Sequence, residues 1–388
     1  MKDEHDKHLS GGKHFSLETS ARRYSRLFAR RTFLGGTLAA LVAACSSSPT
    51  GQSSATTPRP EASPTQTIRV PRAPISPSNA AQMQKLALLQ VNAGRVRGLA
   101  WAPDGKTLAV GTQGAVFLWD VLTGKQLARL TGMSSSTQVY QLSWSLDGRS
   151  LAAGDDENTL LIWDTRSHSL QKTLQGTASV VLSVAWSPAG DRLAAGNSDG
   201  TVQIWERATW RALHTWNDPA APGPFRRGRL PVAAYTVAWA PGGEELAATR
   251  YDGYVRVWDS HAGKLLHVLR TGDQPNGVSW SPDGQTLASA SDDGTIQLWN
   301  ASTYKQKSAL AGEPQGGWAF AIPWSPDGRL LACSRDGSLV LIWDGQTGKE
   351  LNALHEQTGS IWTAAWSPDS QRLAAGCDDG TVCLWGVL

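Results

Sequence analysis

The chain has 388 residues, with 39 glycines, 20 prolines and 18 tryptophans but only 18% charged residues, a composition that argues against long amphipathic helices. Its formal charge of +3 comes from residues 1–44, which hold eight Lys or Arg and four Asp or Glu. The remainder therefore holds 36 − 8 = 28 cations against 33 − 4 = 29 anions, a net charge of −1. Because nucleic-acid binding normally needs clustered cations, we expect no nucleic-acid partner.

The first element is the stretch "RRTFLGGTLAALVAAC", whose uncharged run over residues 32–44 has 13 residues. A bilayer crossing needs about 20 residues, and Gly35-Gly36 disfavours a buried helix. Arg30, Arg31, Phe33 and Leu34 resemble the twin-arginine export motif, and "LVAAC" resembles a bacterial lipobox. The resemblance implies a signal peptide over residues 1–44 and lipidation of Cys45, with a plain cleaved signal as the alternative because Val42 stands where leucine is commoner.

The next segment, residues 45–80, is predicted to be a lipidated cysteine followed by a disordered tether. Of the 35 residues from 46 to 80, 20 are Ser, Thr or Pro. Such a segment buries too little apolar surface to offset its ordering entropy. We expect it to hold a domain of residues 81–388 to the outer side of the cytoplasmic membrane of a bacterium. The alternative is a linker that has no role beyond its length.

Internal repeats dominate the rest of the chain. A tryptophan that follows an alternating stretch recurs at Trp101, Trp144, Trp186, Trp239, Trp280, Trp324 and Trp366. A second series follows 18 or 19 residues behind, at Trp119, Trp163, Trp205, Trp258, Trp299, Trp343 and Trp385. Each copy contains an alternating stretch such as "YTVAW", followed by turns and further alternating runs. This pattern predicts four antiparallel strands in each copy. One such sheet is unstable alone, so the copies are expected to pack face to face.

These repeats resemble the tryptophan-aspartate (WD) repeat family, whose name the endings "LWD", "IWD" and "VWD" carry. The resemblance implies an all-β, seven-bladed propeller. The last copy stops after its third strand, and "KLALLQ" (residues 85–90) before the first copy matches the missing one. Residues 86–90 are therefore predicted to close the last blade. The family's Gly-His pair is missing from every copy, so we interpret the turn aspartates as turn formers.

No catalytic motif, phosphate loop or metal-ligand spacing occurs, and we expect no enzyme activity, cofactor or metal. Cys333, Cys377 and Cys383 are interpreted as free buried thiols, with pairing of the last two left open.

In this family, partners usually bind the face that carries the loops entering each first strand, and this resemblance places candidate residues four and six positions before each first-strand tryptophan. The partner-binding candidates, including two residues that precede turn aspartates, are Arg95, Arg97, Tyr140, Tyr235, Tyr251, Asn276, Trp318, Phe320, Arg335 and Trp362. Aromatic residues and Arg are enriched at binding hot spots, although the same rings could pack between blades. An insertion adds Phe225, Arg226, Arg227 and Arg229 to this face, either as a flap or as a tolerated loop.

The sequence therefore predicts an exported, membrane-tethered and non-catalytic interaction scaffold. Its partner at the propeller face is an unidentified protein or peptide, and we expect a monomer. Two alternatives remain, an extracytoplasmic propeller enzyme (a hydrolase or lyase) and a glycan-binding module with the aromatic residues as stacking platforms.

Overall fold

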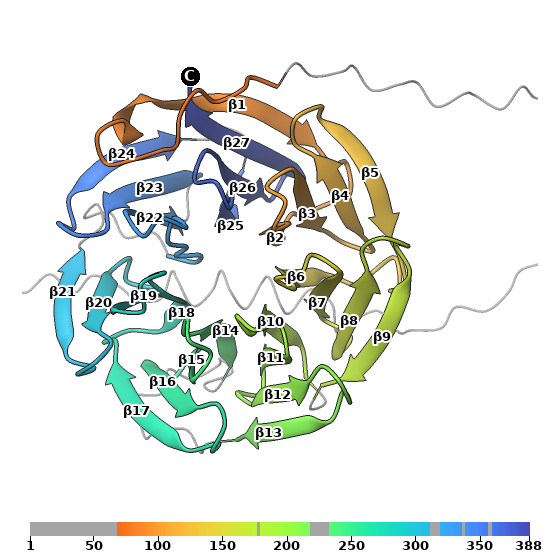
Figure 1. Cartoon of the computed structure of the whole chain (residues 1–388), viewed down its shortest axis with the longest axis vertical. Coiled ribbons are helices and arrows are strands. Elements are labelled where there is room, and N and C mark those ends of the chain that lie inside the picture. The colour runs from red at the N-terminus through yellow and green to blue at the C-terminus, as the bar shows by residue number, and fades with distance from the viewer. Residues whose placement is uncertain (1–67, 177–178, 218–232, 311–318, 336–337, 356–358) are drawn as a thin grey trace, which may run out of the picture. The chain divides into compact units, whose positions relative to one another are not determined.

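The computed structural model describes residues 68–388 except 177–178, 218–232, 311–318, 336–337 and 356–358. The described residues of the compact unit that spans 62–225 and 230–388 form seven antiparallel sheets arranged in a ring (Figure 1). This confirms the predicted all-β, seven-bladed propeller. The residues predicted to belong to the signal and the lipidation site, Arg30, Arg31, Phe33, Leu34 and Cys45, lie outside the described residues.

Blades 1 to 5 each have four strands in chain order, with the first strand innermost (Figure 1). Blade 1 contains β2 (Gly98–Trp101), β3 (Thr107–Gly111), β4 (Val116–Asp120) and β5 (Lys125–Leu130). Blade 2 contains β6 (Val139–Trp144), β7 (Ser150–Asp155), β8 (Thr159–Asp164) and β9 (Leu170–Gln175). Blade 3 contains β10 (Val181–Trp186), β11 (Arg192–Asn197), β12 (Val202–Glu206) and β13 (Ala212–Trp216). Blade 4 contains β14 (Ala234–Trp239), β15 (Glu245–Arg250), β16 (Tyr254–Asp259) and β17 (Leu265–Arg270). Blade 5 contains β18 (Pro275–Trp280), β19 (Thr286–Ser291), β20 (Ile296–Asn300) and β21 (Gln306–Leu310).

Blade 6 departs from the predicted pattern of four strands. It contains β22 (Leu330–Arg335), β23 (Leu339–Asp344) and β24 (Glu350–His355), and its innermost segment makes only isolated bridges at Ala319 and Trp324. Pro323 lies in that segment, and proline cannot donate a ladder hydrogen bond. The segment nevertheless follows β22, since the Pro323 carbonyl accepts from the Ala332 N–H.

Blade 7 is completed by a strand from the other end of the chain, which confirms the predicted closure. It contains β25 (Ile361–Trp366), β26 (Leu373–Cys377) and β27 (Thr381–Val387), and β27 pairs with β1 (Met83–Gln90). The closing strand therefore begins three residues before the predicted start at Leu86. Leu86 and Leu89 pack in the cluster shared with blade 1, whereas Met83 packs in the cluster that contains blade 6 residues.

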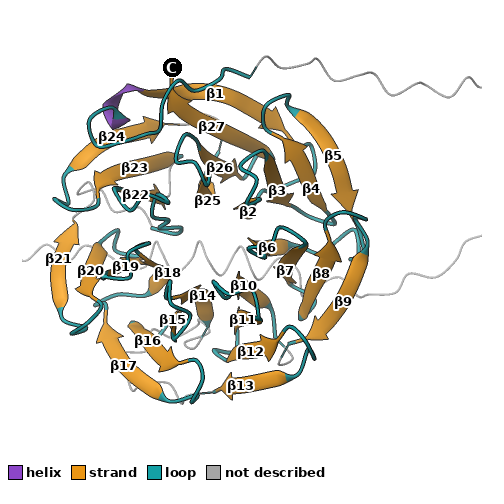
Figure 2. Cartoon of the chain, viewed as in Figure 1, coloured by secondary structure: helices purple, strands orange, loops and turns teal. Residues whose placement is uncertain are grey.

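The segment over residues 68–82, which we call the strap, lies against blade 7. Its backbone N–H groups at Arg72 and Ile75 donate to the carbonyls of Val387 and Ser370, both at 2.9 Å. Ile75 is fully buried, and the strap ends in the short 3-10 helix η2 (Ala80–Gln82), drawn in purple beside β24 in Figure 2. Residues 68–80 fall within the range that the sequence assigns to the tether. This part of the range contains two buried apolar side chains, Ile68 and Ile75.

The inner-strand tryptophans link successive blades through their indole N–H groups. In five blades this N–H donates to the carbonyl of the residue that precedes the inner-strand tryptophan of the previous blade: Trp101 to Ala365, Trp144 to Ala100, Trp239 to Ala185, Trp280 to Ala238 and Trp366 to Pro323. The indole N–H groups of Trp186 and Trp324 are buried without a hydrogen-bond partner among the described residues. In both cases the corresponding residue of the previous blade is a serine, Ser143 or Ser279, whose hydroxyl is bonded to backbone atoms of the next blade.

We expect Trp239→Phe to lower the free energy of unfolding by about 1 kcal/mol more than Trp186→Phe does. Both rings are largely buried, at 8% and 7% exposure, and each has an arginine guanidinium over it. Only Trp239 donates across the blade interface, so its replacement leaves the Ala185 carbonyl without that donor. Denaturant unfolding of the two variants measures the difference. Equal losses would show that the indole hydrogen bonds contribute nothing.

Three of the described turn aspartates shape their turns as predicted, whereas Asp252 does not. The carboxylates of Asp199, Asp293 and Asp379 accept the backbone N–H two residues ahead, which shapes each turn. Asp252 instead forms a fully buried ion pair with Arg256 at 2.8 Å. Cys333 is a free, buried thiol, and burial raises its pKa to about 12. Cys377 and Cys383 are also buried.

Candidate functional site

The loops that enter the inner strands lie beside the turns that join the second and third strands. In five blades a turn residue donates its backbone N–H to the residue six positions before the inner-strand tryptophan: Asp156 to Gln138, Ser198 to Val180, Tyr251 to Ala233, Asp292 to Gln274 and Asp378 to Ser360. The loop positions and the turn positions chosen from the sequence therefore share one face of the ring. We call it the entry face.

A β-bulge occupies the position four residues before the tryptophan in five inner strands. In four of these strands the bulge residue has no pairing partner on the second strand, although both of its neighbours do: Tyr140, Leu182, Asn276 and Trp362. In blade 4 two successive residues, Tyr235 and Thr236, have no pairing partner. A bulge bends the strand and redirects the side chain of its extra residue. The same bulge therefore recurs in five blades, and at each one the side chain departs from the regular in-and-out alternation of the strand.

Four side chains from four successive blades form a continuous row on the entry face. The ring centroids of Phe320 (blade 6) and Trp362 (blade 7) are 4.5 Å apart. The Arg97 guanidinium (blade 1) lies 4.5 Å from the Trp362 ring centroid and 5.6 Å from that of Tyr140 (blade 2). We call Phe320, Trp362, Arg97 and Tyr140 the aromatic arc. All four are partly buried, and Arg97 Nε and Trp362 Nε1 are buried atoms without a hydrogen-bond partner among the described residues.

The candidates in blades 4 and 5 form a separate, more buried group. The rings of Tyr235 and Tyr251 are tilted against each other with centroids 5.2 Å apart. The Tyr251 hydroxyl lies 3.4 Å from the Asp292 carboxylate, which also accepts from the Asn276 side-chain amide at 2.6 Å. Asn276 in turn donates to the Ala319 carbonyl of blade 6. Asn276 therefore links blade 5 to blade 6.

The remaining candidates are distributed unevenly. Arg95 is exposed and lies 3.6 Å from the Asp378 carboxylate, whereas Arg335 is 3% exposed and donates to the Gly294 carbonyl. Trp318 and the loop residues Phe225, Arg226, Arg227 and Arg229 lie outside the described residues. The structure brings four of the predicted residues together in the aromatic arc. The sequence contains no signal for the bulges or for the contacts of Arg97 with two rings, because the ring contacts depend on packing between blades.

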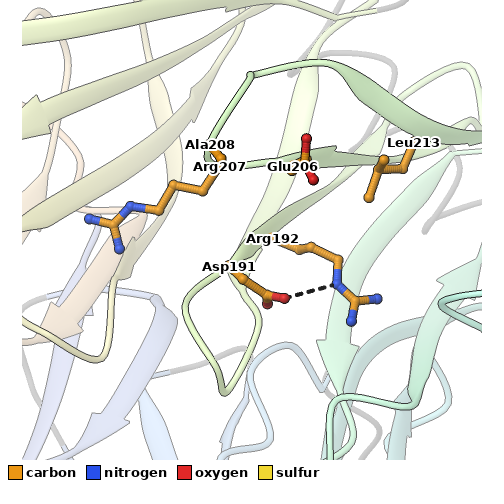
Figure 3. Close-up of a pocket in the computed structure, with 6 residues that line it drawn as sticks. All are labelled: Asp191, Arg192, Glu206, Arg207, Ala208 and Leu213. Carbon is orange, nitrogen blue, oxygen red and sulfur yellow. Dashed lines mark ion pairs between the residues drawn. The ribbon is translucent and has the colours of Figure 1, made fainter.

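A cavity of about 480 Å³ in blade 3 was not anticipated (Figure 3). Its lining comes from the turns that join the first to the second strand and the third to the fourth, and from the adjoining ends of these strands, so it belongs to the opposite face. The lining residues are Asp191, Arg192, Glu206, Arg207, Ala208 and Leu213. Burial raises the pKa of Asp191, but the Ser187 hydroxyl and the Arg192 guanidinium outweigh it and leave this pKa below its ordinary value. The cations already have partners, since Arg192 pairs with Asp191 and Arg207 pairs with Asp147.

Few groups suited to catalysis or metal binding come together in the described part of the chain. No cluster of three or more His, Cys, Asp or Glu side chains there has the geometry of a metal site. No helix among the described residues is long and apolar enough to cross a membrane. The chemistry that the entry face offers is that of aromatic surface, hydrogen bonding and a stacked cation.

Comparison with known proteins gives matches to WD-repeat families. The model described as "WD domain, G-beta repeat" matches residues 84–120, 124–164 and 168–206, and the model described as "WDR19 first beta-propeller" matches residues 235–387. The chain is 24% identical to WD repeat-containing protein 1 of Xenopus tropicalis over 44% of this chain and 27% of that protein. It is 26% identical to Cell division cycle 20.4, cofactor of APC complex, of Arabidopsis thaliana over 51% of this chain and 44% of that protein.

A shorter match is to Protein transport protein SEC13 homolog B of Arabidopsis thaliana, with 35% identity over 21% of this chain and 29% of that protein. The chain thus spans less than half the length of these curated relatives. The matched repeats, the seven sheets and the closure by β1 agree with one another. The chain belongs to the WD40-repeat family of seven-bladed β-propellers, which generally serve as protein-interaction scaffolds.

Proposed function

We propose that this protein is a non-catalytic scaffold that binds a protein or peptide on its entry face. The observation that carries the proposal is the aromatic arc, which joins side chains of four successive blades, each four residues before the inner-strand tryptophan. Trp, Tyr and Arg are enriched among the few residues that supply most of the binding energy at protein interfaces, and a rigid propeller presents them at little entropic cost. The relative described as a cofactor of a complex is consistent with such a role.

We also propose that the protein is exported and held at the outer side of the cytoplasmic membrane through a lipid on Cys45. The support is the order of the sequence features: two arginines, a short apolar run, small residues before Cys45, and a Ser/Thr/Pro-rich segment. A propeller closed by its N-terminal strand suits export in the folded state, because β1 and β27 lie at opposite ends of the chain. The test of the anchor is argued in the Discussion.

Comparison of captured proteins tests the binding face. Full-length wild type, Trp362→Ala, Tyr235→Ala and a control, Leu213→Ala, are used to capture proteins from a cell-envelope extract, which are then quantified by mass spectrometry. Leu213 is 41% exposed and lines the cavity on the opposite face. We expect at least one protein to be retained by wild type and Leu213→Ala but reduced about tenfold or more by Trp362→Ala.

The capture experiment also separates the alternatives. Identical recovery by wild type and both entry-face variants, with unchanged melting temperatures, contradicts the assignment of the face. Turnover in a panel of glycan and peptide substrates would favour an enzyme. Retention of the protein on an insoluble glycan that depends on Trp362 would favour a glycan-binding module.

A further inference from the structure

We propose that Arg97 is the specificity element of the entry face and binds a single carboxylate of the peptide or protein partner. This inference rests on the proposed function and names the partner's chemistry. Arg97 precedes β2, and its guanidinium lies between the rings of Trp362 and Tyr140, with centroid distances of 4.5 and 5.6 Å. Stacking on two rings holds the plane of a guanidinium and leaves its N–H edge for a ligand.

The Arg97 guanidinium makes no hydrogen bond or ion pair with any described residue. Its Nε is buried, which is costly for a charged donor that has no acceptor. Other arginines of this face have acceptors: Arg95 has Asp378, and Arg335 has the Gly294 carbonyl. Arg97 therefore contacts two rings and has a buried donor without an acceptor among the described residues, which is the arrangement expected of a ligand-binding cation.

The surrounding charges limit what this cation can bind. The turns on the entry face carry the carboxylates Asp156, Glu157, Asp292, Asp293, Asp378 and Asp379. These repel a partner with several negative charges, such as a nucleic acid or a multiply phosphorylated segment. A single carboxylate directed at Arg97 gains a charge-assisted and geometrically matched pair with less repulsion. The flanking rings of the aromatic arc suit apolar residues on either side of that carboxylate.

The experiment uses a phage-displayed library of random linear peptides, selected on the full-length wild-type chain. We expect peptides that bind wild type and not Trp362→Ala to carry an Asp, a Glu or a terminal carboxylate at a fixed position. For one such synthetic peptide, replacing the carboxylate with its amide is expected to weaken binding at least about tenfold. Arg97→Gln should cause a similar loss and should bind the acid and amide peptides equally.

Arg95→Gln is the matched control, because Arg95 lies two residues away and is already paired with Asp378. It should keep the preference for the acid, and Arg97→Lys, which retains the charge without the planar fork, should give an intermediate loss. Peptides that depend on Trp362 but show no acid preference, or a preference that survives Arg97→Gln, overturn this inference and leave the proposed function standing. Tighter binding of a phosphoserine version overturns the carboxylate assignment. An empty selection, or peptides indifferent to Trp362→Ala, overturns both.

Discussion

Removal of residues 1–91 is expected to abolish the cooperative unfolding of the propeller and to cause aggregation. The deletion removes β1, which pairs with β27 through seven residue pairs from Met83 to Gln90. All seven residues of β27 are buried, so the deletion turns an apolar strand that is paired on both sides into an open edge of the sheet. Such an edge exposes unpaired backbone groups and is a template for pairing with other chains.

Point variants separate the effect of β1 from the loss of the strap. Leu89 is 2% exposed and packs between blade 7 and blade 1, so Leu89→Asp buries a charge where an apolar side chain contributed about 2 kcal/mol. We expect a loss of at least about 4 kcal/mol, a large part of the 5–15 kcal/mol that stabilises a typical domain. Gln84→Asp, at an exposed position of the same strand, should change the stability by less than about 0.5 kcal/mol.

Thermal and denaturant unfolding of the deletion and of the two point variants provide the measurement. Light scattering during the thermal scan reports aggregation. An unchanged melting curve after the deletion would contradict closure by β1. Equal losses for Leu89→Asp and Gln84→Asp would show that the strand is peripheral to the fold.

The fold was accessible from the sequence because its determinants are local and repeated. The alternation before each tryptophan, the Asp-Gly turns and the matching ends of the chain predict strands, turns and closure without knowledge of distant contacts. The exceptions come from single residues. Pro323 interrupts the inner segment of blade 6, and Ile75 holds the strap against blade 7 within a range that otherwise has the composition of a tether.

The geometry of the candidate site was less accessible. The periodicity places Arg97, Tyr140, Phe320 and Trp362 at equivalent positions, but it does not indicate which of the seven equivalent side chains touch. The arc forms because three large rings and one guanidinium occupy adjacent blades, whereas blade 3 has Leu182 at this position and blade 5 has Asn276, which bonds to Asp292. The β-bulges at Tyr140 and Trp362 leave no composition signal of their own.

Cys45→Ala is expected to release the protein from membranes while leaving the melting temperature of the propeller unchanged. On the proposed topology, acyl chains on Cys45 supply the membrane affinity, at about 0.8 kcal/mol for each buried methylene. Their loss removes that affinity and no contact of the described residues, which begin at residue 68. Membrane fractionation and detergent phase partitioning measure the release, and mass spectrometry of the wild type detects the acyl mass on Cys45.

The matched control is Cys333→Ala. Cys333 is fully buried in blade 6, and burial raises the pKa of its thiol to about 12, so it is neither accessible nor ionised for acylation. This variant should stay with the membrane fraction, although its stability falls because a buried sulfur is lost. The lipid anchor on Cys45 would be rejected if Cys45→Ala stayed in the membrane fraction and mass spectrometry detected no acyl group on Cys45 of the wild type. Release of Cys45→Ala alone would make that cysteine the attachment point from which the tether and the strap lead to blade 7.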